Sequence, residues 1–220
     1  MLEKKKIPLG IVTGIRGSFR FRDAFCKGEY LHSGATPYDY RKDSVVAVSN
    51  LVNEMNIFWK AQLKKNKDLV ITFGQFFTDN EEHSFAKSSG LVNFCIDVRS
   101  NSKNTLEYTK KILIKKIKLI EKQTKTKFFL GKETNSEPAL MDKKLIKKFQ
   151  IYSKMISMKF ETMASGAGHD ASVFANHGIP SLMLFIRNKN GSHNPKEYMS
   201  IKNFEKVFKV LKGIIKDNYI

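Results

Sequence analysis

Hydrophobic and polar residues alternate with two different periods along the first part of the chain, which predicts strands followed by a helix. Residues 7–15 form a short apolar run that is typical of a buried strand, and residues 18–34 alternate like a long strand. Residues 43–65 carry apolar side chains three and four positions apart, behind an Asp43 that favours a helix N-terminus. The pattern therefore predicts two strands and then a helix.

The same patterns continue to residue 133 and complete a unit. They predict strands over 68–77 and 90–100, a helix over 104–123 and a strand over 126–133. The helix is expected to open at Asn104 or Thr105. Residues 18–123 thus follow the order β-α-β-β-α, which is that of a split, ferredoxin-like sandwich.

The remaining residues show the alternation of helices and strands that is typical of an α/β layer. They predict helices over 142–156, 168–177 and 201–217 and a strand over 178–186. This strand, GIPSLMLFI, is apolar without alternation, so we expect it to be buried on both faces. The chain therefore holds two α/β domains of different design.

The formal net charge of +18 raises the question of a nucleic-acid partner. Only six of the 39 basic residues are Arg, although nucleic-acid sites rely on its bidentate contacts, whereas Lys is a hydrated point charge suited to open surface. In KKILIKKIKLIEK the lysines alternate with Ile and Leu at helical spacing, as on a solvated helix face. We therefore interpret the charge as lysine-rich surface, and a nucleic-acid site is the less favoured alternative.

The two cysteines and the N-terminal residues indicate a reducing compartment. Cys26 and Cys95 lie among alternating apolar residues and lack the spacing of metal ligands, so we interpret both as core thiols. The opening MLEKKKIPLG has charge without an apolar segment of a signal peptide, and no run approaches the ~18 apolar residues that span a bilayer. We expect a cytoplasmic protein without a membrane partner.

Three groups of residues carry types that do chemistry. They are YLHSGATPYDYRKDS (30–44), FCIDVRS (94–100), and SGAGHDA followed by GSHNPKEY (165–198). Each alone is a weak signal, because a histidine in a loop is more often a hydrogen-bonded structural residue. In this order, HSGATP with R-x-D and SGAGHDA with SH-x-P-x-E resemble the hydantoinase/carbamoylase group of zinc-dependent amidohydrolases, within the aminoacylase/carboxypeptidase superfamily. The resemblance covers nearly the whole chain.

The resemblance implies a fold and an activity. The fold is a zinc-exopeptidase-like α/β catalytic domain, in part, with an inserted ferredoxin-like α/β lid that makes a homodimer. Residues 16–126 match the lid, whereas residues 1–15 and 127–220 match parts of the catalytic domain. The implied activity is hydrolysis of a linear amide or ureido C–N bond in a small carboxylate-bearing substrate, such as an N-carbamoyl amino acid or allantoate. Two divalent metal ions, Zn or Mn, serve the complete enzyme.

The resemblance assigns roles to two histidines. His193 matches a metal-binding histidine, and a neutral imidazole on a glycine-bounded loop is a rigid ligand for zinc. The alternative for His193 is a hydrogen bond to Glu197. His32 matches a lid histidine that in relatives reaches the active site of the other subunit, where it polarises the scissile carbonyl and holds the developing oxyanion. The alternative for His32 is a surface histidine at a strand end.

The resemblance makes Arg99 the clamp of the substrate carboxylate, a bidentate task in which Lys would not replace it. The alternative is a surface salt bridge to Asp97, which the alternation of side chains along a strand disfavours. Relatives often carry a substrate-contacting Asn thirteen residues before this Arg, where this chain has Ala86. This departure leaves the substrate open, with His83 and Lys87 as candidates for that contact.

SGAGHDA resembles the active-site loop of the family, in which small residues let the backbone and the pair His169–Asp170 line the substrate cavity. Asp170 either orients a histidine or caps a helix that starts near Ala171. Gly191 matches a position whose backbone contacts substrate in relatives.

A two-metal hydrolytic site needs about five protein ligands and a base that activates the bridging water. The resemblance places these in a His-x-Asp motif, a bridging Asp, a Glu-Glu pair and a later His, and of the whole set only His193 occurs here. We therefore expect the C-terminal portion of a carbamoylase-type enzyme, which binds no metal tightly alone and needs its first half, separately encoded or lost. The alternative is an inactive remnant that acts only as a dimerising or binding module.

Overall fold

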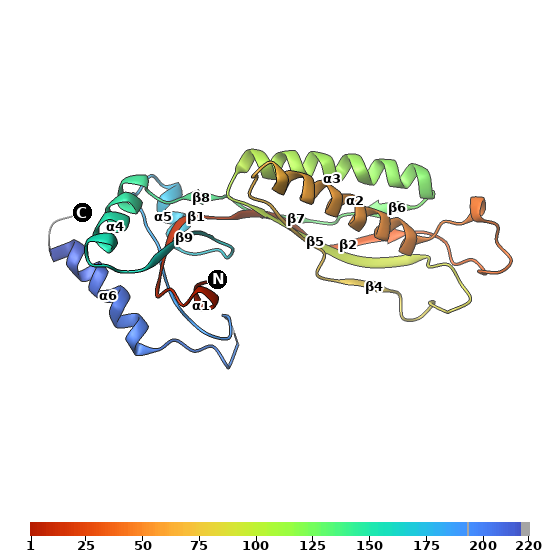
Figure 1. Cartoon of the computed structure of the whole chain (residues 1–220). Coiled ribbons are helices and arrows are strands. Elements are labelled where there is room, and N and C mark those ends of the chain that lie inside the picture. The colour runs from red at the N-terminus through yellow and green to blue at the C-terminus, as the bar shows by residue number, and fades with distance from the viewer. Residues whose placement is uncertain (193, 217–220) are drawn as a thin grey trace. The chain divides into compact units, whose positions relative to one another are not determined.

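The computed structural model describes residues 1–192 and 194–216 and divides into two compact units (Figure 1). Unit 1 combines Met1–Arg16 with Pro138–Ile220, and unit 2 is Gly17–Glu137. Within the described residues, no helix is both long enough and apolar enough to cross a membrane.

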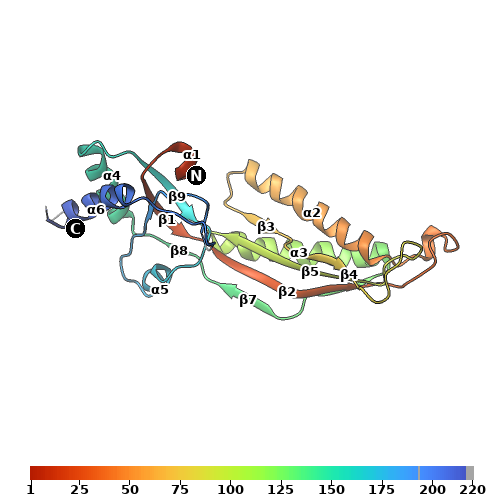
Figure 2. The same ribbon diagram turned by 90° about the horizontal axis from the view of Figure 1, so that it is seen from below.

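Unit 2 is an antiparallel sheet with two helices on one face. Its sheet has the order β3-β5-β2-β6, with β4 beside β5 and β7 beside β2, and α2 and α3 cover one face of it in Figures 1 and 2. The elements are β2 (Gly17–Lys27), the 3-10 turn Tyr38–Tyr40, α2 (Ser44–Lys64), β3 (Val70–Thr72), β4 (Phe76–Thr78), β5 (Leu91–Ser100), α3 (Lys103–Thr124), β6 (Lys127–Phe129) and β7 (Glu133–Ser136). The predicted order β-α-β-β-α is confirmed in part, because the strand expected over 68–77 is observed as two short strands, β3 and β4, and three strands therefore lie between α2 and α3.

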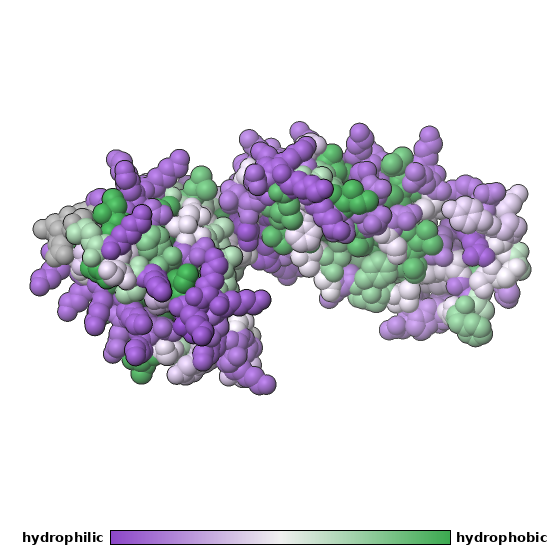
Figure 3. Space-filling view, viewed as in Figure 1, coloured by the Kyte–Doolittle hydropathy of each residue, from purple (hydrophilic) through white to green (hydrophobic). Residues whose placement is uncertain are grey.

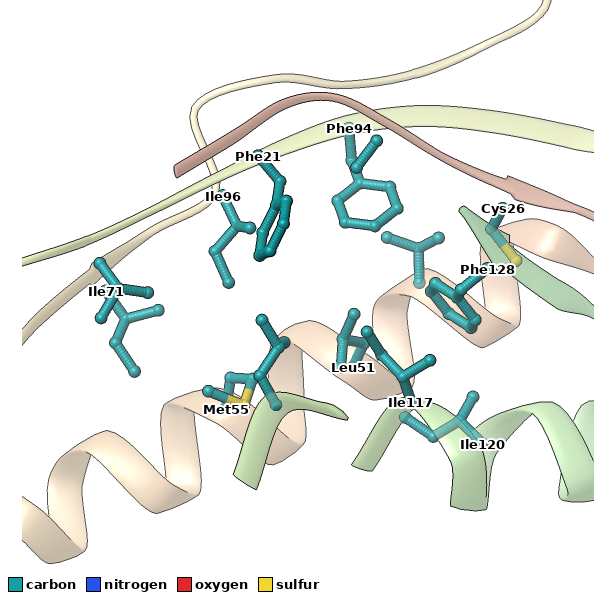
Figure 4. Close-up of a cluster of buried hydrophobic side chains, with 14 of the residues drawn as sticks. Phe21, Cys26, Leu51, Met55, Ile71, Phe94, Ile96, Ile117, Ile120 and Phe128 are labelled. Carbon is teal, nitrogen blue, oxygen red and sulfur yellow. The ribbon is translucent and has the colours of Figure 1, made fainter. Parts of the chain in front are cut away.

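The core of unit 2 lies between the sheet and the two helices. Along β5 every second residue is buried against the helices, and the residues between them are only half-buried. Cys26 belongs to this core, whereas Cys95 is half-buried on the other face. Figure 4 shows the side chains that meet in the core, which include Phe21, Phe94, Ile96, Phe128, Leu51, Met55, Ile117 and Ile120.

Both long helices begin at a capping side chain. Asp43 Oδ1 accepts from the N–H of Val45 at 2.9 Å and of Val46 at 3.2 Å, as the sequence predicted for α2. The predicted start of α3, Asn104 or Thr105, is one or two residues late, because Ser102 Oγ accepts from Thr105 N–H at 3.3 Å and α3 therefore begins at Lys103. The local hydrogen bond of the cap decides the boundary.

Unit 1 is built around β1, which has neighbours on both edges. β9 pairs with it in parallel, and β10 and β8 pair antiparallel along the other edge. Side chains of α4 and α6 pack with Leu9 and Ile11, whereas α5 packs with Val12 and Ile15. The elements are α1 (Leu2–Lys5), β1 (Leu9–Ile15), β8 (Ala139–Leu140), α4 (Lys143–Met155), β9 (Phe160–Ser165), α5 (Ala171–Asn176), β10 (Leu184–Ile186) and α6 (Ile201–Lys216).

Two sequence expectations about this architecture are wrong. The boundary expected at residue 126 falls after Glu137, because β6 and β7 both pair with β2 and so belong to unit 2. The strand expected over 178–186 is limited to Leu184–Ile186 and is half-buried, because β10 pairs with β1 alone among the described strands. An apolar run is therefore not always a strand covered on both faces.

The lysines cover helix surfaces. In α3 the residues Lys111, Lys115 and Lys118 are exposed, whereas Leu113 and Ile117 are buried. Figure 3 shows hydrophilic residues spread over the visible face of each unit. This distribution fits the interpretation of the charge as a solvated surface.

Candidate functional site

His32 lies in an exposed turn after β2, and the backbone of that turn holds its ring. The N–H groups of Gly34 and Ala35 both donate to His32 Nδ1, each at 3.2 Å. Because Nδ1 accepts these bonds, the neutral ring carries its hydrogen on Nε2, which is then a donor. His32 is thus an exposed histidine with a fixed tautomer, suited to donate to a carbonyl oxygen.

The R-x-D motif supports this turn and the helix after it. Arg41 Nε donates to Thr36 O at 3.0 Å, and Arg41 Nη2 donates to Ser33 O. Asp43 caps α2. One residue of the motif therefore fixes the turn that carries His32, and the other starts the next helix.

A short segment around Lys87 lies beside the histidine turn. His32 and Lys87 form an antiparallel bridge, and the turn's backbone donates to Ala86 O at 2.7 Å. Residues directly opposite each other in such a pair place their side chains on the same face. His83 instead forms a hydrogen bond with Thr78 Oγ1 at 3.1 Å. Of the two side chains that could replace an asparagine at position 86 as a substrate contact, Lys87 is the one that lies opposite His32.

Tyr30 fixes the end of the strand that leads to His32. Its ring packs on Gly90 so closely that a Cβ there would lie 2.4 Å from Tyr30 Cδ2. Its hydroxyl donates to Asp79 Oδ2 at 3.0 Å, and burial together with this hydrogen bond raises the pKa of Tyr30 to about 12. The same contact, after the backbone N–H of Glu81, lowers the pKa of Asp79.

Arg99 lies in β5 and is paired with Asp97. Its Nε lies 3.1 Å from each carboxylate oxygen, and its Nη2 donates to Asp97 Oδ2 at 2.6 Å. These hydrogen bonds raise the pKa of the Arg99 guanidinium, against the lowering effect of its burial. The expectation that alternation keeps the two apart is wrong, because positions two apart on a strand point to the same face. The salt bridge exists, and it uses a fork that suits any carboxylate.

His32 and Arg99 lie at opposite ends of the sheet of unit 2. Arg99 pairs with Ser18 near the start of β2, whereas the N–H of Gly28, beyond the other end, donates to Gly90 O before the chain reaches His32. A strand rises about 3.3 Å per residue, so Ser18 and Gly28 lie roughly 30 Å apart. One small ligand therefore does not touch both residues within a single unit 2.

The loop with His169 joins β9 to α5. Ser165 Oγ lies 2.7 Å from His169 Nε2, and Phe185 meets the histidine ring edge-on with centroids 6.0 Å apart. Ser165 is buried and fixes the orientation of the half-buried histidine. The sequence patterns assigned this serine no role. The only sequence signal for its contact with His169 is that it lies four residues earlier in the chain.

Asp170 stands at the N-cap position of α5 without acting as a side-chain cap. Its backbone is helical, with φ −58° and ψ −31°, whereas a capping residue needs an extended backbone to aim its side chain at the first N–H groups. His169 O instead accepts from Ser172 N–H at 2.9 Å and from Ser172 Oγ at 2.7 Å. The capping alternative is therefore wrong in its chemistry, and Asp170 is an exposed carboxylate beside His169.

Gly191 lies in the loop between β10 and α6, which a bridge between Lys189 and Tyr198 closes. Its φ of +73° lies in the left-handed region that favours glycine. His193, with its expected metal role or its hydrogen bond to Glu197, lies outside the described residues.

The described residues do not fit a two-metal centre. Within 1–192 and 194–216, no group of three His, Cys, Asp or Glu side chains is placed to hold a metal ion. Two metal ions need about five ligands. The donor set that the resemblance implies is therefore not supplied by this part of the chain.

Fold and sequence together define the class of this protein. The sequence matches the Peptidase family M20/M25/M40 over residues 3–217, and the chain belongs to that family. It is 30% identical to the allantoate amidohydrolase of Escherichia coli strain K12, over 96% of this chain and 50% of that protein. It is 32% identical to the N-carbamoyl-L-amino-acid amidohydrolase of Pseudomonas sp. strain NS671, over 98% of this chain and 51% of that protein.

Solved structures agree on the fold. A hydantoinase/carbamoylase family amidase from Burkholderia multivorans superposes with a TM-score of 0.84 at 23% identity, covering 96% of this chain and 50% of that one. The resemblance to the hydantoinase/carbamoylase group is confirmed. The chain spans about half the length of the relatives that it matches.

Proposed function

We propose that the chain forms part of a metal-dependent, carbamoylase-type amidohydrolase, which hydrolyses a linear amide or ureido C–N bond in a carboxylate-bearing substrate. N-carbamoyl amino acids and allantoate-like ureides are the expected substrates, because relatives 30% and 32% identical to the chain are named for them. Since the chain spans half of those relatives, the activity belongs to the whole assembly of which these residues form a part.

The observation that carries the proposal is the exposed Nε2–H of His32, whose ring two backbone N–H groups already hold. A hydrogen bond from this group to the scissile carbonyl oxygen would polarise the carbonyl and stabilise the oxyanion that develops on attack. Such a donor lowers the activation barrier by ~3 kcal/mol, which raises the rate about a hundredfold. The role is that of an electrophilic catalyst.

The separation of His32 from Arg99 supports a dimer. Ser18, which pairs with Arg99, and Gly28, which precedes His32, lie roughly 30 Å apart in one unit 2, which is further than a small substrate reaches. If Arg99 binds the carboxylate of a substrate, the histidine that meets its carbonyl must come from a second copy. We therefore propose a homodimer in which unit 2 acts as the lid.

Further residues complete the proposed site. The fork of Arg99 takes the substrate carboxylate, and the backbone of Gly191 with the pair His169–Asp170 lines the cavity. In the complete enzyme two divalent metal ions, Zn or Mn, would supply the activation of the attacking water, and His193 would be one of the residues that hold them. We propose a cytoplasmic location.

The test is the release of ammonia from N-carbamoyl-L-amino acids and from allantoate, with Zn or Mn supplied, by protein that includes residues 1–220. His32→Ala should lower kcat about a hundredfold with little change in KM, because the oxyanion exists only in the transition state. Arg99→Lys should mainly raise KM, because the charge remains while the fork is lost. His177→Ala is the matched control, because it removes an exposed histidine to which no role in the site is given. Equal and small effects from the first two changes would remove these residues from the site.

The alternative is a module that dimerises or binds a partner without catalysis. A stable dimer in sedimentation, together with no turnover in any metal-supplied form, would select this alternative.

A further inference from the structure

Three charged side chains form a cluster on the sheet face of unit 2 that is turned away from α2 and α3. Arg20 of β2 lies directly opposite Asp97 of β5 in the strand register, and Arg99 follows two residues later. Arg20 Nε donates to Asp97 Oδ2 at 3.2 Å, and Arg99 Nη2 donates to the same oxygen at 2.6 Å. A single carboxylate therefore holds two guanidinium groups.

This sharing matters because Arg99 cannot present the same fork to Asp97 and to a ligand at once. Its Nε and Nη2 both contact the Asp97 carboxylate, in the geometry with which arginine takes any carboxylate. A ligand carboxylate that draws this fork away competes with Asp97 for it. The free energy of releasing Asp97 is then part of the free energy of binding.

The cost of that release depends on what remains around Asp97. Its side chain is only 25% exposed, so water replaces a departing cation only in part. Breaking a partly buried ion pair on one side leaves a charge without compensation, which is the costly outcome. Arg20, whose side chain is 28% exposed, still contacts Asp97 Oδ2 after Arg99 has left.

We propose that Arg20 is a positioning residue, which keeps Asp97 paired while Arg99 turns from Asp97 to the carboxylate of a ligand. Arg20 acts through Asp97 and needs no contact with the ligand. The inference rests on the proposed function in one respect, namely that Arg99 takes a carboxylate. Without Arg20, Arg99 is the only cation that Asp97 contacts among the described residues, and Asp97 then competes more strongly with the ligand.

The experiment measures carboxylate binding by the 220-residue chain itself. The probe is N-carbamoylglycine, titrated to saturation, and heteronuclear NMR of the arginine Nε–H groups reports the dissociation constant at Arg99. The variants are Arg20→Gln, Asp97→Asn and the double variant. Arg22→Gln is the matched control, because it removes the same charge from an exposed position of the same strand. Fluorescence of the single Trp, Trp59, checks that each variant is folded.

We expect the effect of Arg20→Gln on the dissociation constant to depend on whether Asp97 is present. Arg20→Gln raises the dissociation constant about tenfold, within the usual range of coupling between contacting charges. In the Asp97→Asn background the same change has less than about a twofold effect, because no carboxylate is left to compete. Arg22→Gln also stays within about twofold, since an exposed charge is screened.

The possible outcomes distinguish the positioning role of Arg20 from the proposed carboxylate site at Arg99. If Arg20→Gln has no effect, or weakens binding equally with and without Asp97, the positioning role is refuted while carboxylate binding at Arg99 stands. If Arg99→Lys binds the probe as well as the natural chain, or if the Arg99 signal does not respond to the probe, the carboxylate site of the proposed function fails, and the inference fails with it.

Discussion

Substituting Gly90 by alanine tests whether the contact between Tyr30 and Gly90 fixes the strand end before His32. The new Cβ would lie 2.4 Å from Tyr30 Cδ2 and 2.5 Å from Cε2, well inside contact distance. Gly90 is buried, so the ring must move rather than the backbone. Such overpacking costs about 2 kcal/mol, and loss of the hydrogen bond from Tyr30 to Asp79 adds about 1 kcal/mol.

The assay is urea unfolding followed by the fluorescence of Trp59. This is the only tryptophan of the chain, and it packs against the core of unit 2 and donates from Nε1 to Leu69 O at 2.6 Å. Its signal therefore reports the unfolding of unit 2 alone. A signal from the whole chain would combine the unfolding of both units, for which a two-state analysis does not hold. We expect Gly90→Ala to lower the free energy of unfolding of unit 2 by about 3 kcal/mol.

Two controls decide whether the clash is the cause. Gly74→Ala places a Cβ in ordinary contact, 3.5 Å from Cys95 Sγ, and should change the free energy of unfolding by less than about 0.5 kcal/mol. In a Tyr30→Ala background, Gly90→Ala should become nearly neutral because the ring is gone. A loss of the same size with and without the ring would refute the reasoning.

Two further predictions concern the same unit and use the same fluorescence signal. Asp43→Ala removes the cap that accepts two N–H groups at the start of α2 and should lower the free energy of unfolding by about 1 kcal/mol, so an unchanged midpoint would contradict the capping role. Burial raises the pKa of the Cys26 thiol from 9.0 to about 11, so the unfolded thiol ionises at lower pH than the folded one. The stability of unit 2 should therefore fall as pH rises through this window, and Cys26→Ala should remove that part of the slope; equal slopes would contradict the prediction.

The sequence predicted the elements whose signals are local. The helix expected over 43–65 is observed as Ser44–Lys64, because apolar periodicity and a capping aspartate coincide there. β9 was not predicted, because Phe160–Ser165 has no clear alternation and becomes a strand by pairing in parallel with β1. That pairing joins residues far apart in the sequence, which no local pattern records. The boundary at Glu137 depends on the same kind of long-range pairing.

In the candidate site, too, the sequence predicted what depends on local signals and missed what depends on long-range contacts. Residue types and motif order pointed to His32 and Arg99, and the family is confirmed. The pairing of Arg99 with Asp97 was within reach of the sequence, because a period of two places both on one face. The contact of Arg20 with Asp97 depends on strand register, and the bond of Ser165 to His169 depends on how a loop folds back. The spacing of residues along the sequence does not reveal contacts of this kind.

The turn that holds His32 also has a consequence for the entropy of binding. An exposed histidine usually samples several rotamers, and fixing such a side chain at the moment of association costs about 0.5–1.5 kcal/mol. Here two backbone N–H groups of its own turn already hold the ring. Most of that ordering therefore occurs when the turn folds, so the histidine meets a ligand with little rotational freedom left to lose.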